Sequence, residues 1–162
     1  IGKSELNFLE KIISNSIQIV NLENFEIDPK KNVIAISADH QSTLFSEAAS
    51  ASFHADGWQV YSLGDMSSSI DVLFDLDLQK FLTKVWKPGT GIMVIVVFSS
   101  TEESMKFFAE SVNSIKLKSR RSLYLAICGD MKKNAEIEAD LIDEDLEAIL
   151  QWSQTTFESS VS

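Results

Sequence analysis

Polar side chains that can do chemistry follow an apolar run at residues 39–43, where the chain reads Asp-His-Gln-Ser-Thr. A histidine beside an aspartate can serve as a metal ligand, because the carboxylate holds the imidazole in one orientation. The hydroxyls next to them can bind an anion at the start of a helix. His40 is therefore a candidate metal ligand supported by Asp39, and a histidine simply exposed to solvent in a loop is the alternative.

Phosphoryl-transfer, nucleotide and hydrolytic sites are not matched by these residues. A phosphorylated receiver needs an aspartate where residues 98–100 read Phe-Ser-Ser. The 39–43 turn lacks the glycine that lets backbone N–H groups close around a phosphate, and the GxGxxG and GxxxxGK[ST] fingerprints are absent. The two histidines, His40 and His54, have no matching nucleophile. The sequence therefore predicts a protein that is not an enzyme.

Charge and composition narrow the classes of partner. The chain has 162 residues, with 24 acidic against 14 basic side chains and a net charge of −10. Such a chain repels phosphate backbones, so direct nucleic-acid binding is not expected. No apolar run reaches the length of a membrane span, and the single cysteine, Cys128, lies in an apolar strand as an inert thiol. We expect a cytoplasmic protein.

Alternating strands and helices must position these side chains. Apolar runs predict buried strands at 32–37, 58–63, 92–98 and 122–128, and a weaker one at 136–142. Apolar residues at helical spacing predict helices at 4–20, from 44 to the Gly57 breaker, and at about 70–85, 100–115 and 144–157. Right-handed crossovers then give a doubly wound, five-stranded parallel sheet of order 2-1-3-4-5, a flavodoxin-like α/β fold. Residues 1–31 are assigned to an N-terminal helix and linker, and 32–162 to the α/β domain.

Capping residues indicate where the helices begin and end. Gly57 has the place of a C-terminal cap, and Ser42 that of an N-cap after the first strand. The serines at 67–69 are expected to cap the next helix, and the S-x-x-E pattern at 100–103 has the spacing of a capping box. Asp143 is expected to open the last helix.

The carboxyl ends of parallel strands meet at one edge of such a sheet, where ligands bind. The hydroxyls in these turns exceed what capping two helices requires, and Phe45 adds an apolar wall that a planar ring could use and a phosphate could not. If heme binds there, His40 is a better ligand than His54, which is expected at the far end of its helix. The predicted cofactor groove comprises Asp39, His40, Gln41, Ser42, Thr43, Phe45, Ser67, Ser99, Ser100, Thr101 and Gly129.

Residues 55–64, ADGWQVYSLG, followed by a serine-rich turn, resemble the second strand of cobalamin-binding domains. That family carries D-x-H-x-x-G in its first turn, and the histidine of this motif ligates cobalt. The corresponding positions here hold His40, Ser42 and Phe45. Serine thus stands in place of the ligating histidine, and phenylalanine in place of the glycine.

The resemblance covers about residues 32–157. The family's S-x-L motif is approximated by residues 99–101, and its glycine pair after the fourth strand by Gly129 alone. Residues 137–150, IEADLIDEDLEAIL, are similar to the family's last strand and helix. The resemblance therefore implies a cobalamin-binding-like fold with a degenerate cofactor turn.

Degenerate members of this family serve as sensor domains that bind heme instead of cobalamin, or bind nothing and make protein contacts. The resemblance thus implies a non-catalytic regulatory module in signal transduction or transcription regulation, with heme or another tetrapyrrole as cofactor. Its partner would be a protein or a fused sensory or effector domain. A corrinoid-binding domain of a methyltransferase or isomerase, and a ligand-free interaction scaffold, are the alternatives.

Overall fold

The computed structural model describes residues 26–69, 73–87, 90–119, 122–130 and 136–161. The helix expected over 4–20 lies outside these residues, and so does most of the segment assigned to 1–31. Within the described residues, no helix is long and apolar enough to cross a membrane.

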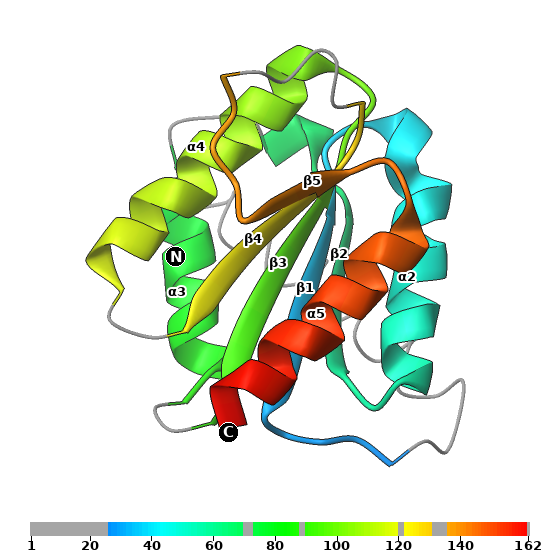
Figure 1. Cartoon of the computed structure of the whole chain (residues 1–162). Coiled ribbons are helices and arrows are strands. Elements are labelled where there is room, and N and C mark those ends of the chain that lie inside the picture. The colour runs from blue at the N-terminus through cyan, green and yellow to red at the C-terminus, as the bar shows by residue number, and fades with distance from the viewer. Residues whose placement is uncertain (1–25, 70–72, 88–89, 120–121, 131–135, 162) are drawn as a thin grey trace.

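The sheet has five parallel strands in the order β2-β1-β3-β4-β5, which confirms the predicted fold (Figure 1). The two strands expected at its centre, β1 and β3, each have a neighbour on both sides. The strands are β1 (Lys31–Ser37), β2 (Gln59–Asp65), β3 (Ile92–Phe98), β4 (Leu123–Cys128) and β5 (Leu141–Asp143).

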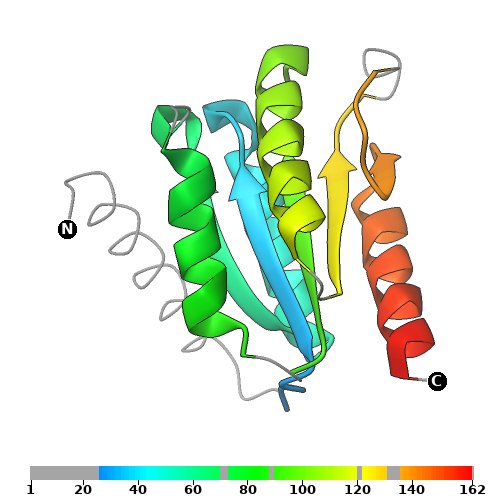
Figure 2. The ribbon, with the colours of Figure 1, turned by 90° about the vertical axis from the view of Figure 1, so that its left-hand side faces the viewer.

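Helices cover both faces of the sheet, α3 and α4 on one and α2 and α5 on the other (Figures 1 and 2). Successive strand side chains point to opposite faces, so Ile34 and Ile36 join the first core while Val33 and Ala35 join the second. The helices are α2 (Thr43–Ala55), α3 (Phe74–Val85), α4 (Glu102–Lys118) and α5 (Leu146–Val161), with short 3-10 turns at His40–Ser42 and Ser67–Ser69.

The end of α2 confirms the expected glycine cap. Gly57 has a φ of +88°, a backbone conformation that other residues rarely adopt. Its N–H donates to the His54 carbonyl at 3.0 Å, and the N–H of Trp58 donates to the Phe53 carbonyl at 3.0 Å. These bonds satisfy the last carbonyls of the helix and turn the chain into β2.

The last strand and the last helix have bounds that differ from those predicted. The strand expected over 136–142 pairs only as β5, because the carboxylate of Asp140 accepts the Leu125 N–H at 2.8 Å and so takes the donor that a longer strand would use. The last helix begins at Leu146 rather than after Asp143. The side chain that accepts an N–H in its first turn belongs to Asp145, from Glu147 at 3.0 Å.

The start of α3 was also predicted wrongly. The serines at 67–69 form their own 3-10 turn instead of capping a helix, and α3 begins at Phe74 with Leu73 at its N-cap position. A serine cluster offers hydroxyls to the backbone in either arrangement, so its composition does not decide between a cap and a turn.

Candidate functional site

The carboxylate of Asp39 joins two of the turns at the carboxyl edge of the sheet. One oxygen accepts the Ser42 N–H at 3.0 Å and the Ser42 hydroxyl at 2.8 Å. The other accepts the N–H of Ser100, in the turn after β3, at 2.7 Å. A second link between these turns is the Ser100 hydroxyl, which donates to Gln41 at 3.1 Å. The predicted residues of the first and third turns are therefore close together.

These bonds keep Asp39 ionised to a lower pH than an ordinary aspartate. Burial by itself raises the pKa of the carboxyl, but the hydrogen bonds from Ser100 and Ser42 outweigh it, so the pKa lies below its ordinary value of 3.8. Asp39 is thus an ionised carboxylate whose two oxygens both accept hydrogen bonds from neighbouring turns. It acts as a brace between them.

Of the two helix caps predicted at this edge, one is right in position and the other is wrong. Ser42 holds the N-cap position of α2 as predicted, but its side chain makes no capping bond there. Its hydroxyl donates to Asp39, whose carboxylate caps the preceding 3-10 turn. The cap of α4 is Thr101, not Ser100, and its hydroxyl accepts the Ser104 N–H at 3.2 Å. The charged Asp39 carboxylate is a strong acceptor, and it binds the Ser42 hydroxyl and the Ser100 N–H.

His40 points to another neighbour. Its side chain is 91% exposed, and its Nδ1 lies 3.7 Å from a carboxylate oxygen of Asp65, in the last position of β2. In the part of the chain that the structure describes, no group of three or more His, Cys, Asp or Glu side chains could hold a metal ion. Asp39, expected to support the imidazole, is the brace described above.

A hollow of about 200 Å³ opens beside these turns. Six predicted residues line it, whereas Asp39, His40, Thr43, Ser67 and Thr101 do not. The six are Gln41, Ser42, Phe45, Ser99, Ser100 and Gly129. Its volume is below the roughly 300–1,000 Å³ of typical small-molecule sites.

Two of the predicted residues outside the hollow have structural contacts instead. The Thr43 hydroxyl lies 3.5 Å from that of Ser37, the last residue of β1. Ser67 donates its N–H to the Asp65 carboxylate at 2.9 Å. Both contacts hold a turn against the end of its own strand.

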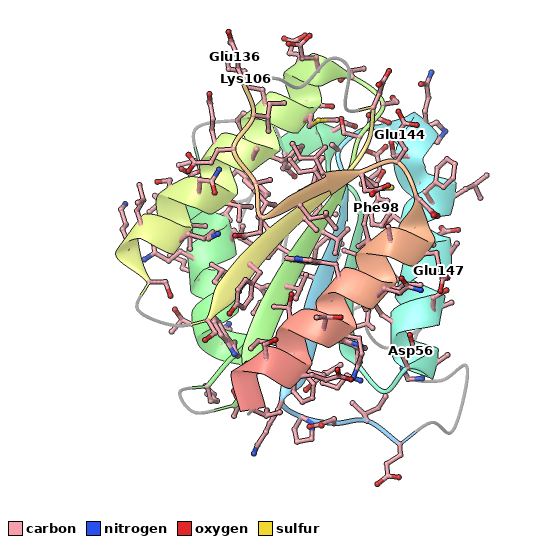
Figure 3. The ribbon with its side chains drawn as sticks, viewed as in Figure 1. Asp56, Phe98, Lys106, Glu136, Glu144 and Glu147 are labelled. Carbon is pink, nitrogen blue, oxygen red and sulfur yellow. The ribbon has the colours of Figure 1, made fainter. Side chains whose placement is uncertain are left out.

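Four residues of the hollow were missed by the sequence reasoning: Phe98, Cys128, Asp130 and Glu144. Phe98 and Cys128 are the last residues of β3 and β4, so the same rule about strand ends would have found them. Figure 3 shows Phe98 and Glu144 near each other where the strands end.

Gly129 and Cys128 give the floor of the hollow its shape. A Cβ at Gly129 would lie 3.0 Å from the Ser99 carbonyl oxygen and 2.4 Å from the end of Met105, so a larger residue there would make the Met105 side chain move and crowd the turn after β3. Burial, followed by the nearby carboxylates of Asp143, Asp145 and Glu144, raises the pKa of the Cys128 thiol to about 11. The thiol is therefore protonated at neutral pH, as expected for an inert cysteine.

No family model matches the chain, and a search of curated proteins finds no match. Among solved structures, the chain is similar to the monomethylamine corrinoid protein of Methanosarcina barkeri, with a TM-score of 0.54 and 16% sequence identity. The alignment covers 91% of this chain and 66% of that one. The likeness is one of fold. It supports the cobalamin-binding-like architecture that the sequence resemblance implied.

Proposed function

We propose that the chain is a non-catalytic regulatory module that works by binding at the carboxyl edge of its sheet. The observation that carries the proposal is the Asp39 brace, which uses both carboxylate oxygens on Ser42 and Ser100. A brace of this kind shapes a binding surface, and it engages Asp39 itself, so that Asp39 is not the carboxylate that faces the His40 imidazole. The signal would pass to a protein partner or to a fused domain.

The position that would hold the cobalt ligand supports this proposal. Ser42 is buried, and its hydroxyl is already bonded to Asp39 at 2.8 Å. A neutral serine oxygen is also a poor substitute for imidazole on a transition metal. Incubating the protein with methylcobalamin, followed by gel filtration, tests the point. We expect the corrinoid to separate from the protein, and stoichiometric retention would contradict the proposal.

Heme is the tetrapyrrole for which this edge offers an exposed nitrogen donor, His40. A hemin titration should produce a shift of the Soret band that His40→Ala removes. The matched control is His54→Ala, since His54 is buried near the end of α2. Loss of the shift in His54→Ala alone would place the heme elsewhere. Absence of any shift in the unmutated protein would exclude heme as the ligand, and regulation through protein contacts would then be the remaining proposal.

A corrinoid-binding domain of a methyltransferase or isomerase is the second candidate. The fold likeness to a corrinoid protein favours it, at a TM-score of 0.54. Without an imidazole at position 42, the corrinoid would be held by the walls of the hollow alone. The Phe45 side chain, 62% exposed on that wall, would then contact it, so Phe45→Ser should weaken any methylcobalamin retention.

A further inference from the structure

Carboxylates gather at the edge of the sheet where the candidate site lies. They stand in the turns after the strands and in the first turns of α3, α4 and α5. Figure 3 shows two of them, Glu144 and Glu147, near the start of α5. The set comprises Asp39, Asp65, Asp75, Asp77, Glu102, Glu103, Asp130, Asp143, Glu144, Asp145 and Glu147.

Most lysines in the described residues lie away from this edge. Lys106, in the second turn of α4, is the exception. The others stand before β1 or in it, in the later turns of the helices, or after α3: Lys30, Lys31, Lys80, Lys84, Lys87, Lys116 and Lys118. Lys132 and Lys133 lie outside the described residues. Among the described residues, the edge where the strands end is thus strongly acidic.

Helix dipoles favour acidic residues in first turns, but they do not account for the apolar side chains at the same edge. Leu44 and Phe45, in the first turn of α2, are 77% and 62% exposed, and Phe45 lines the hollow. Leu73 and Leu76, at the start of α3, are also exposed. Large apolar side chains held in water cost free energy that a partner covering them would recover.

We infer that this edge docks a basic, amphipathic polypeptide segment whose apolar residues cover Leu44 and Phe45 and whose Lys or Arg side chains meet the surrounding carboxylates. The inference rests on the proposed function, since it names the partner of the same edge. An edge with both carboxylates and apolar side chains favours a partner that has both basic and apolar side chains, and the carboxylates raise its rate of association. A second copy of this chain is disfavoured, because it presents the same acidic edge and a net charge of −10.

A fluorescein-labelled peptide of leucine and lysine, arranged as an amphipathic helix, is the probe, and its anisotropy reports binding. The matched probe carries glutamate in place of every lysine. The test variant is the double substitution Leu44→Ser and Phe45→Ser. Its control is Leu117→Ser, since Leu117 is 89% exposed near the end of α4, away from this edge.

We expect the lysine peptide to bind the unmutated protein and the glutamate peptide not to bind. The double variant should lose about tenfold or more in affinity, and Leu117→Ser should stay within about twofold. Glu144→Gln should weaken binding by about threefold at about 50 mM salt and have less effect at about 300 mM, while Glu110→Gln on α4 should have none. All of these side chains except Phe45 and Glu144 are outside the hollow.

Several results would overturn the inference: no binding of the lysine peptide, equal binding of both peptides, or equal losses in the double variant and Leu117→Ser. Sedimentation that shows a dimer dissociated by the Leu44 and Phe45 substitutions would assign the edge to a second copy instead. The methylcobalamin assay on the same preparation keeps the two proposals separate. Retained corrinoid contradicts the proposed function, whereas unbound corrinoid together with unbound peptide contradicts only the docking inference.

Discussion

Replacing Asp39 with alanine removes the acceptor that joins the turn after β1 to the turn after β3. Three hydrogen bonds are lost, from the Ser42 N–H, the Ser42 hydroxyl and the Ser100 N–H. Each is worth about 0.5–1.5 kcal/mol net, for a range of about 1.5–4.5 kcal/mol. Asp39 is only partly buried, so water can replace part of the loss. We therefore expect a decrease of about 2 kcal/mol in the free energy of unfolding.

Urea denaturation measures this change, and Asp39→Asn is its control. Asparagine keeps one acceptor oxygen at the same place but no charge, so it should cost less than alanine. A loss of about 2 kcal/mol corresponds to a Tm lower by about 4–8 °C for a domain of this size. A loss below about 0.5 kcal/mol for Asp39→Ala, or equal losses for both variants, would refute the role of the carboxylate as a brace.

The pH dependence gives a second measure of the same brace. The pKa of Asp39 is lower in the folded protein than the ordinary 3.8. The ionised carboxylate therefore stabilises the fold above that ordinary pKa, and the stabilisation disappears as the pH falls through the lower folded pKa. The difference in unfolding free energy between the unmutated protein and Asp39→Asn should be constant above about pH 5 and shrink below about pH 3.8. A difference that grows on acidification would contradict this assignment.

Three further predictions follow from buried contacts. With a pKa of about 11, Cys128 should react with iodoacetamide at pH 8 about 100-fold more slowly than a free thiol, until urea unfolds the chain. The Lys31 ammonium donates to the Asp56 carbonyl at 2.8 Å and lies 5.2 Å and 5.5 Å from the ring centroids of Trp58 and Phe157. Lys31→Ala should therefore lower the free energy of unfolding by about 1–2 kcal/mol, and Lys31→Met, which keeps an apolar chain, by less. Thermal denaturation measures both losses. Backbone amides of β1 and β3 should exchange far more slowly with deuterium than those of the short edge strand β5.

The sheet and its order were predictable from the sequence. Residues 92–98 are continuously apolar, and β3 has these bounds. A strand covered on both faces by helices must be apolar at every position, so the pattern is local and strong. Right-handed crossovers limit the possible strand orders, and 2-1-3-4-5 is one of the common orders of doubly wound sheets. The location of the groove was also predictable in part, because the carboxyl ends of neighbouring parallel strands meet at one edge whatever their side chains are.

Tertiary structure alone decided how the polar residues of that edge are paired. In the sequence, Ser42 is a good N-cap and Ser100 begins an S-x-x-E pattern. In the fold, Asp39 lies between their two turns, and its charged carboxylate binds both of them. Ser42 and Ser100 are 58 residues apart in the chain, so no local sequence pattern shows that both bind the same carboxylate. Which acceptor a hydroxyl or N–H meets depends on distances between turns, and only the packing of the sheet fixes those distances.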